Sequence, residues 1–357
     1  MSVSIQALLR FMHMHNASDL HLVSASTPFI RILGDLRTIG AEKLSTDDML
    51  DILRQTASPA QVEQFMASGD LDYAYEVPNM ARYRINFYRE NNGIAAAFRE
   101  IPTAIKTLEE LGMPRQLQEL AMLPKGVVLV TGPTGSGKST TLAALLNYAN
   151  TVRRDHIITI EDPIEFLHSS RSCLINQREV GRDTRSFAAA LRSALREDPD
   201  IILVGEMRDL ETISLALEAA ETGHLVFATL HTISASKTID RIIEVFPAGE
   251  QQQIRTSLAE SIQAVISQTL FKRRDGTGRI PALEILLATP AIRNLIRENK
   301  TFQIQSILQT NHSLGMRTLD DDIERLLAAS LIEPAAALVH AQNKQRISEA
   351  IKKHHGV

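Results

Sequence analysis

Four nearly continuous apolar runs in the middle of the chain predict buried β-strands. The runs are GVVLVT, HIITIE, DIILVG and HLVFATL, and they alternate with stretches of helical spacing. Strands that are covered on both faces carry unbroken Val, Ile and Leu residues, whereas half-exposed strands alternate apolar with polar positions. Strands that alternate with helices form βαβ units. The pattern therefore predicts an α/β domain, built on a parallel sheet, from residue 115 onward.

The first 101 residues contain short runs of alternating apolar and polar positions, which predict a small mixed α+β domain. The stretch ARYRINFYRENNGIAAAFREI predicts two antiparallel strands joined by a turn at residues 91–93. Its alternation places an apolar face opposite a basic face that carries Arg82 and Arg84. The segment PTAIKTLEELGMP, residues 102–114, is bracketed by prolines and is predicted to be a linker.

No further strand of the buried kind is recognisable beyond residue 271. Three later segments have helical spacing instead, at 290–299, 318–330 and 333–352. The predicted organisation is a domain at 1–101, a linker at 102–114, and an α/β domain at 115–357 whose subregion 271–357 is mainly helical.

Composition and charge narrow the class of protein. The chain has 357 residues, of which 44% are hydrophobic and 4% aromatic, which is typical of a soluble protein with about two domains. The 38 basic and 42 acidic residues give a net charge of -4, so no global field attracts nucleic acid or anionic lipid. We therefore expect no direct nucleic-acid partner.

Cysteine content and hydropathy indicate a reducing compartment and no membrane span. Cys173 is the only cysteine, which excludes an intramolecular disulfide and a four-cysteine zinc site. No window approaches the roughly 18 to 20 uncharged apolar residues that a transmembrane helix needs. We predict a cytoplasmic protein without zinc, whose contact with a membrane depends on a partner.

The strongest chemical motif begins directly after the first buried strand. Residues 132–139 match GxxxxGK[ST] and run into the helical stretch TTLAALLNYAN. Glycines let backbone N–H groups curl around phosphate oxygens, and the helix start adds its positive dipole end. Lys138 is expected at the β- and γ-phosphates of ATP, and Ser139 at Mg²⁺. The predicted nucleotide-binding residues are Gly132, Pro133, Thr134, Gly135, Ser136, Gly137, Lys138, Ser139 and Thr140.

Acidic residues follow the next two predicted strands. Glu161, Asp162 and Glu165 form an acidic box after one strand, and Glu206 follows another. Ligands of parallel sheets bind beyond the carboxyl ends of the strands, where these acids fall. We predict that Glu206 orients and helps to deprotonate the attacking water, and that the acidic box holds water molecules of Mg²⁺. The alternative is that they are ordinary loop acids and helix caps.

Two histidines stand at opposite ends of the last predicted strand, ETGHLVFATLHT. His224 and His231 are too far apart along an extended strand to touch one phosphate. His231 lies at the carboxyl end, so we predict that it senses the γ-phosphate. A packing or surface role for His231 is an equally weighted alternative.

The order of these motifs resembles that of a known family. GPTGSGKST, TIEDPIEF, DPDIILVGEMRD and ETGHLVFATLHT are similar to the Walker A motif, Asp box, atypical Walker B motif and His box of the type IV pilus and type II secretion ATPases. The resemblance runs through essentially the whole chain. It implies a PAS-like N-terminal domain, a RecA-like ATPase domain and a ring-forming homo-hexamer that hydrolyses ATP with Mg²⁺.

The resemblance also implies that arginines of one subunit complete the nucleotide site of its neighbour. The matching positions are Arg84 and Arg99, with Arg82 the weaker match. A guanidinium there would neutralise charge on the γ-phosphate during transfer. Without the resemblance, the same residues are equally well explained as a solvated basic face of a sheet.

A C-terminal motif favours the retraction branch of the family. AIRNLIRE is similar to a motif of pilus retraction motors, and a chain with one cysteine cannot hold the zinc element of the extension branch. Thr289 is predicted to cap a helix that begins at Pro290. An ordinary amphipathic helix is the alternative. The motif comprises Ala291, Ile292, Arg293, Asn294, Leu295, Ile296, Arg297 and Glu298.

The implied partners follow from the same branch. They are five further copies of the chain, a PilC-like platform protein at the inner-membrane face of the pilus machine, and a PilU-like paralogue or another pilus ATPase. A PilU-like accessory role, a nucleotide-binding ring that serves another motor, and a DNA-translocating ATPase are the competing functions. The last is the weakest because the chain has no dense basic stripe.

Overall fold

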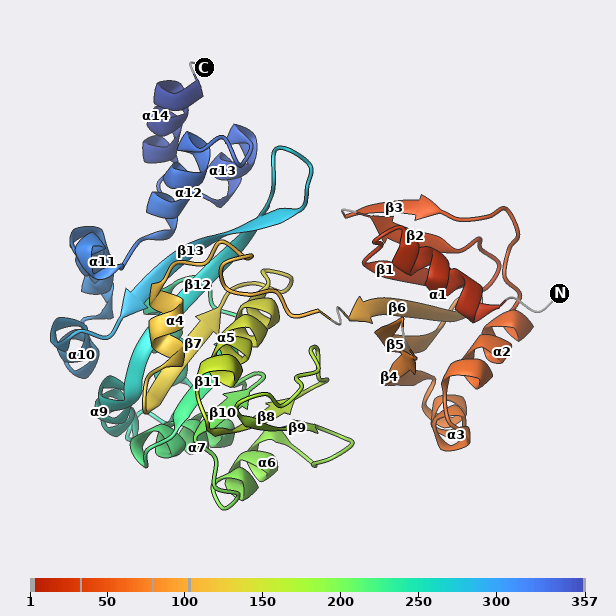
Figure 1. Cartoon of the computed structure of the whole chain (residues 1–357), viewed down its shortest axis with the longest axis horizontal. Coiled ribbons are helices and arrows are strands. Elements are labelled where there is room, and N and C mark those ends of the chain that lie inside the picture. The colour runs from red at the N-terminus through yellow and green to blue at the C-terminus, as the bar shows by residue number, and fades with distance from the viewer. Residues whose placement is uncertain (1–3, 33, 79, 102–103, 356–357) are drawn as a thin grey trace. The chain divides into compact units, whose positions relative to one another are not determined.

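The computed structural model describes residues 4–32, 34–78, 80–101 and 104–355. The chain divides into two compact units, Met1–Ala104 and Ile105–Val357, and each is described here by itself (Figure 1). Within the described residues, no helix combines the length and apolarity needed to cross a membrane.

The first unit is built on an antiparallel sheet. In the part of the chain that the structure describes, this sheet has six strands in the order β3-β2-β1-β6-β5-β4. Helices of the unit pack on its apolar side. The elements are α1 (Ile5–Met14), β1 (Asp19–Val23), β2 (Phe29–Ile32), β3 (Asp35–Thr38), α2 (Thr46–Thr56), α3 (Pro59–Ser68), β4 (Asp70–Val77), β5 (Ala81–Glu90) and β6 (Gly93–Ile101).

The hairpin of β5 and β6 confirms the strand pair predicted around residues 91–93. Tyr83, Ile85 and Phe87 are fully buried, as alternation requires. The Phe87 ring packs edge-on against Phe65 and Phe98, with ring centroids 6.1 and 6.0 Å apart. This apolar face fixes the register of the hairpin and therefore which arginines face outward.

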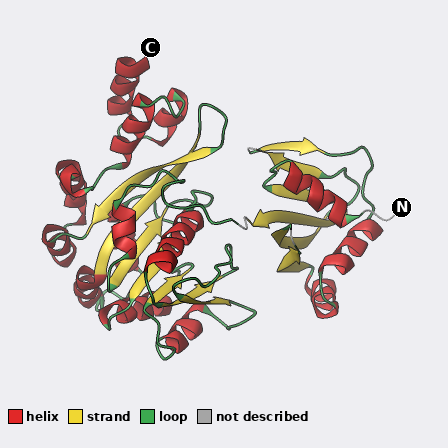
Figure 2. Ribbon diagram, in the orientation of Figure 1, coloured by secondary structure: helices red, strands yellow, loops and turns green. Residues whose placement is uncertain are grey.

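The second unit is built on a mainly parallel sheet (Figure 2). Its strand order, over the described residues, is β13-β12-β7-β11-β10-β8-β9, and only the β12–β13 pair is antiparallel. The four predicted strands lie side by side at its centre. The strands are β7 (Gly126–Thr131), β8 (His156–Glu161), β9 (Leu174–Glu179), β10 (Ile201–Val204), β11 (Leu225–Leu230), β12 (Ile262–Lys272) and β13 (Arg279–Leu287).

Helices cover both faces of this sheet. Val127 and Leu129 of β7 belong to one buried cluster, and Val128 and Val130 of the same strand belong to another. The first cluster also includes side chains of α6 to α9, and the second includes those of α4 and α5. Successive strand residues point to opposite faces, so a strand buried on both sides carries an unbroken apolar run.

The helices of the second unit follow in chain order. They are α4 (Gln116–Ala121), α5 (Lys138–Val152), α6 (Phe187–Ala194), α7 (Leu210–Glu221), α8 (Ala235–Glu244), α9 (Gln251–Ser261), α10 (Pro290–Arg297), α11 (Ile304–Thr310), α12 (Leu319–Ala328), α13 (Pro334–His340) and α14 (Lys344–His355). The short 3-10 turns Thr301–Gln303 and His312–Leu314 flank α11.

Strands β9, β12 and β13 were missing from the sequence-based prediction. The statement that no further strand of the buried kind is recognisable beyond residue 271 overlooked β13. β12 carries the buried polar residues Ser267 and Gln268, and β13 carries Pro281 and the buried Glu284. These residues interrupt the apolar run that identifies a buried strand. Their polar side chains are tolerated because tertiary partners satisfy their hydrogen bonds.

The remaining predicted helices and the linker differ in detail. The segment 333–352 forms two helices rather than one, because the Asp320 carboxylate accepts hydrogen bonds from the backbone N–H groups of Gln342 and Asn343 between them. Residues 102 and 103 of the predicted linker lie outside the described residues. Within the same segment, Leu108 is buried in the core of the second unit.

Candidate functional site

The phosphate loop connects β7 to α5 with a backbone that requires glycine. Gly132, Gly135 and Gly137 have φ angles of 143°, 78° and 88°, a region that side chains rarely allow. A Cβ on Gly132 would lie 2.4 Å from the backbone oxygen of Gln268. Both conformation and space therefore exclude a side chain at Gly132, as expected of a cradle for phosphate.

Lys138 begins α5 and turns back across the loop. Its Nζ donates hydrogen bonds to the backbone oxygens of Gly132, at 2.9 Å, and Pro133, at 3.1 Å. Burial lowers the pKa of the ammonium, while the negative charges of Glu206 and Glu165 act against that shift. The arrangement brings the predicted phosphate-binding cation together with carboxylates of two different loops.

A small cavity of about 30 Å³ lies beside the start of α5. Its polar lining includes Ser139, Glu161 and Thr229. Mg²⁺ is usually held by one or two protein oxygens together with phosphate oxygens and waters. The Ser139 hydroxyl and a carboxylate on one cavity fit that donor set. Among the described residues, no group of three or more His, Cys, Asp or Glu side chains could hold a metal ion, so Mg²⁺ would also need the nucleotide.

Glu161 is the deeply placed acid of the box. Its carboxylate accepts hydrogen bonds from Thr159 Oγ1 at 2.7 Å and from Gln177 Nε2 at 3.3 Å. Burial nevertheless raises the pKa of Glu161 to about 7, because these hydrogen bonds do not offset the loss of water. Glu161 therefore changes charge close to neutral pH, whereas Asp162 and Glu165 are exposed.

Strand β9 holds the acidic loop in place. Gln177 Nε2 donates to the backbone oxygen of Phe166 at 2.8 Å, and Gln177 Oε1 accepts from the backbone N–H of His168 at 2.7 Å. The Glu179 carboxylate accepts from the backbone N–H of Ile164 at 3.1 Å. Neither Gln177 nor Glu179 was predicted, and the motif pattern carries no signal for them.

Glu206 stands at the carboxyl end of β10 between the side chains of Arg208 and His231. Its Oε1 lies 2.6 Å from Arg208 Nε and 3.0 Å from His231 Nε2. Burial alone would raise the pKa of the Glu206 carboxyl, but the hydrogen bond from Arg208 and the charge of His231 outweigh it, so the pKa is lowered. Glu206 is therefore ionised at neutral pH.

The structure separates the two histidines and adds an arginine. His231 contacts Glu206, while His224 Nδ1 lies 2.8 Å from the backbone oxygen of Ala219 at the far end of β11. Arg208 was not predicted, although it stands two residues after Glu206 in the same motif. The site thus places His231 within reach of a carboxylate rather than on a surface by itself.

The predicted arginines belong to the first unit and have acidic partners there. Arg84 Nη2 lies 2.6 Å from Asp72 Oδ2, and Arg99 Nε lies 2.8 Å from Asp19 Oδ1. The Arg99 side chain is 68% exposed and that of Arg84 is 40% exposed. Their charges are therefore neutralised at the surface of the sheet by carboxylates on neighbouring strands.

Helix α10 carries the segment 291–297 of the AIRNLIRE motif and begins as predicted. Thr289 Oγ1 accepts the backbone N–H of Ile292 at 3.4 Å, and Pro290 occupies the first turn. Ile292 and Ile296 are buried in the core of the second unit. Three other motif residues, Ala291, Asn294 and Glu298, are exposed.

Arg293 of the motif has a structural role that the sequence pattern did not predict. Its guanidinium donates to the backbone oxygens of Ala259 and Glu260, at 2.5 and 2.7 Å, which are the last carbonyls of α9. It also reaches Gln263 Oε1 at 3.1 Å. A cation at a helix C-terminus satisfies orphan carbonyls and complements the helix dipole. Arg293 therefore fastens α10 to α9.

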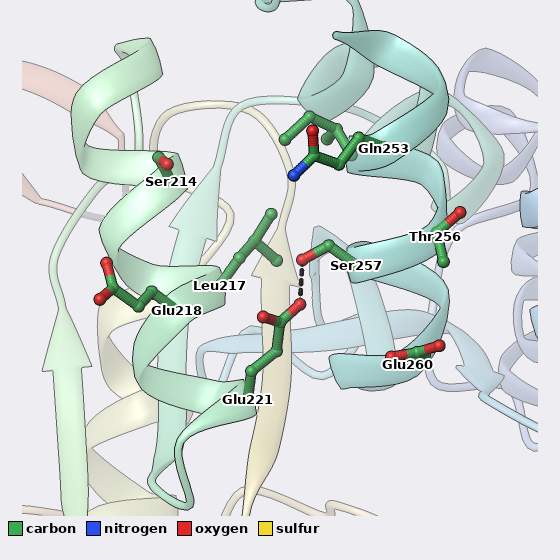
Figure 3. A pocket seen from close by; sticks show the side chains of 9 residues that line it. Ser214, Leu217, Glu218, Glu221, Gln253, Thr256, Ser257 and Glu260 are labelled. Atoms are coloured by element: carbon green, nitrogen blue, oxygen red, sulfur yellow. Dashed lines mark hydrogen bonds between the residues drawn. The ribbon is translucent and has the colours of Figure 1, made fainter.

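A larger pocket of about 340 Å³ lies between α7 and α9 (Figure 3). Leu217 points into it, and Glu221 accepts a hydrogen bond from Ser257 across it. None of the predicted site residues lines this pocket. The larger pocket and the predicted nucleotide site are therefore formed by different residues.

Comparisons with known proteins agree with the motifs. The model of the family described as "Type II/IV secretion system protein" matches residues 93–276. The "Type IV pilus retractation ATPase PilT" of Pseudomonas aeruginosa is 54% identical over 97% of this chain and 99% of its own. A "Twitching motility protein" of Neisseria gonorrhoeae is 52% identical over 97% and 92%.

A solved structure shows the same likeness over the whole chain. The crystal structure described as that of the pilus retraction motor PilT with bound ADP superimposes with a TM-score of 0.89 at 41% identity. It covers 97% of this chain and 99% of the other. The likeness extends over both units of the chain.

Proposed function

Since the chain belongs to the type II/IV secretion system protein family, we propose that ATP hydrolysis at its phosphate loop powers retraction of a type IV pilus. The chain is an ATPase with the α/β fold of retraction motors. The observation that carries the proposal is the convergence of Lys138, Glu206 and Glu161 on the loop, in a chain that matches a retraction ATPase from end to end.

Hydrolysis requires a water in line with the γ-phosphorus of ATP. Glu206 is the group that orients this water, because its lowered pKa keeps it ionised and able to accept a hydrogen bond. The water oxygen bonds to phosphorus as the bond from phosphorus to the bridging oxygen breaks, and a proton of the water passes to the Glu206 carboxylate, which gives ADP and phosphate. Lys138 and the loop N–H groups stabilise the charge on the departing oxygens.

Magnesium fits the site through Ser139, with the acidic box behind it. When bound, Mg²⁺ supplies positive charge that neutralises the β- and γ-phosphate oxygens. Glu161 has a carboxylate on the same cavity as Ser139 and is placed to accept a hydrogen bond from a metal-bound water. His231 contacts Glu206 and is placed to report on the γ-phosphate through that carboxylate.

The proposed working form is a homo-hexamer in which subunits share sites. In this assembly, Arg84 and Arg99 of a PAS-like N-terminal domain, residues 1–101, reach the γ-phosphate of a neighbouring RecA-like domain, residues 115–357. Both arginine side chains are at least 40% exposed, and each is held in an extended sheet by a carboxylate that a phosphate can replace. Closure around ATP would then change the angle between domains across the 102–114 linker.

The proposed partners lie at the inner-membrane face of the pilus machine. A PilC-like platform protein would receive the motion, and a PilU-like paralogue or another pilus ATPase would work beside this chain. The exposed residues of α10, among them Asn294 and Glu298, offer polar groups to such a partner.

Steady-state ATPase assays against protein concentration and particle size test this function. Mg²⁺-dependent turnover that rises with hexamer formation and is lost in Lys138→Ala supports the motor. Arg115→Ala, which removes an exposed cation outside the loop, is the matched control and is expected to retain turnover. A ring that binds ATP without hydrolysing it would contradict the proposal and favour a scaffold for another motor.

A further inference from the structure

Strand β12 lies beside β7 and contacts the phosphate loop that follows β7. It pairs with β7 so that Ser267 stands beside Thr131, the residue that precedes the loop, and their hydroxyl oxygens are 2.8 Å apart. The next residue, Gln268, is 2% exposed. A buried primary amide needs hydrogen-bond partners for its N–H groups and its oxygen, so the partners of Gln268 show which parts of the structure it connects.

Both the nitrogen and the oxygen of the Gln268 side-chain amide form hydrogen bonds with residues of the nucleotide site. Its Nε2 donates to the backbone oxygen of Ser136 at 2.5 Å, and its Oε1 accepts from Thr141 Oγ1 at 2.9 Å. Ser136 lies in the loop, and Thr141 lies in the first turns of α5. The Gln268 side chain therefore connects the loop to α5, the helix that follows the loop.

Gln268 also sets the space available to the loop glycines. Its backbone oxygen would be 2.4 Å from a Cβ on Gly132, and its Nε2 would be 3.1 Å from a Cβ on Gly137. The loop thus approaches Gln268 at its first and its last glycine. Close approach at both points leaves the loop backbone little freedom to move toward β12.

The hydrogen bond to Ser136 orients a phosphate-binding group. In a planar trans peptide, the carbonyl oxygen and the following N–H point in opposite directions. Because the Ser136 carbonyl points at Gln268, the N–H of Gly137 points away from β12, toward the inside of the loop. Gly137 is the N-cap of α5, where free N–H groups and the helix dipole attract anions.

We propose that Gln268 is a positioning residue for nucleotide phosphate, which acts through the Ser136–Gly137 peptide. The inference rests on the nucleotide site proposed above and assigns to β12 a part in it. A methionine of similar length at this position would leave the Ser136 carbonyl and the Thr141 hydroxyl without their partner. The peptide could then rotate and withdraw the Gly137 N–H from the phosphates.

The test compares ADP affinity with thermal stability in the full-length protein. Gln268→Met is expected to weaken Mg-ADP binding by roughly tenfold to a hundredfold, the factor that one lost buried hydrogen bond gives. Thr141→Val removes only the second partner and is expected to weaken binding by less than about fivefold. Gln263→Met on the same strand, which contacts Arg293 rather than the loop, is the matched control and is expected to bind ADP normally.

Hydrogen exchange separates positioning from bulk stability. ADP is expected to protect the backbone amides of residues 132 and 134–139 from exchange in the wild type but not in Gln268→Met, while the amides of β7 exchange alike in both proteins. Unchanged ADP affinity with a lower Tm would overturn the proposal and leave Gln268 a purely structural residue. If Gln268→Met does not fold, unchanged affinity in Gln268→Glu, which loses the donor to the Ser136 carbonyl, overturns it equally. A wild type that fails to bind ADP would instead defeat the proposed function.

Discussion

The phosphate loop and the arginine face of the first unit place positive charge in opposite ways. Lys138 is buried, hydrogen-bonded to its own loop and within the electrostatic influence of the carboxylates of Glu206 and Glu165. Arg84 and Arg99 are exposed, and each is paired with an acid of its own sheet. Lys138 and the backbone groups that hold it come from one short motif, so this positive charge is positioned within a single subunit. Arg84 and Arg99 can act on a nucleotide only if its phosphate takes the place of their acidic partners.

The largest effect is expected from removing the cation of the loop. Lys138→Ala should abolish detectable ATP turnover, because no other described cation is bonded into the loop to stabilise the phosphate charge. Phosphate release measured at saturating Mg-ATP checks this. Arg115→Ala, which removes an exposed cation of the same unit, is the control and should leave turnover intact. Comparable loss in both variants would mean that the loop has no special role.

The arginine face should show its effect only across subunits. Arg84→Ala and Arg99→Ala are each expected to lower turnover by about 10³-fold, the lower range for an arginine that acts on a γ-phosphate. Mixing Lys138→Ala subunits with Arg84→Ala subunits should restore part of the activity, because some sites then combine an intact loop with an intact arginine. Failure of every mixture to recover activity, with mixed rings verified by mass, would contradict action in trans.

Glu206 tests whether the acids of the loop differ in role. Glu206→Gln is expected to lower kcat by about 10²-fold, since the amide oxygen still orients water but cannot accept its proton. Single-turnover kinetics should show normal ATP binding. Glu165→Gln at the exposed end of the acidic loop is the comparison variant, and an equal loss there would remove the distinction between the two acids.

Glu161 should link stability to pH. Its pKa is raised to about 7, so between the unfolded value near 4.5 and pH 7 the unfolded state releases a proton that the folded state keeps. The free energy of unfolding is therefore expected to fall as pH rises through this window and to level off above pH 7. Glu161→Gln should flatten that fall, as seen in Tm at pH 5, 6, 7 and 8. An identical slope in both proteins would show that other groups cause it.

The smallest effect is expected from the acidic partner of Arg84. Asp72→Asn weakens an exposed ion pair, which should change the free energy of unfolding by less than about 1 kcal/mol. If the carboxylate only holds Arg84 until a phosphate replaces it, turnover should change by less than about threefold, in contrast to Arg84→Ala. A loss as large as that of Arg84→Ala would indicate that the pair itself is the functional unit.

Family, ATPase activity and retraction function were predicted from the motifs, and the full-length likeness to a retraction ATPase confirms them. The residues predicted to bind phosphate adjoin one another in sequence, so their spacing was enough to predict them. The roles of Lys138, Ser139, Glu206, His231, Arg84 and Arg99 remain predictions. The hexamer and the bound Mg²⁺ are proposals as well.

The sequence by itself determined the features that depend on neighbours along the chain. These are the central strands, the phosphate loop with its helix, and the hairpin of β5 and β6, because short-range periodicity and glycine conformation dictate them.

Only the tertiary structure decided the features made by distant residues. Gln268 meets Ser136 from 132 positions away, and Arg293 meets Ala259 from 34 positions away. A lone polar residue in a strand gives no sign of its partner, since a satisfied hydrogen bond depends on three-dimensional proximity rather than on local pattern. For that reason the supports of the nucleotide site were found in the fold, and its phosphate-binding groups in the sequence.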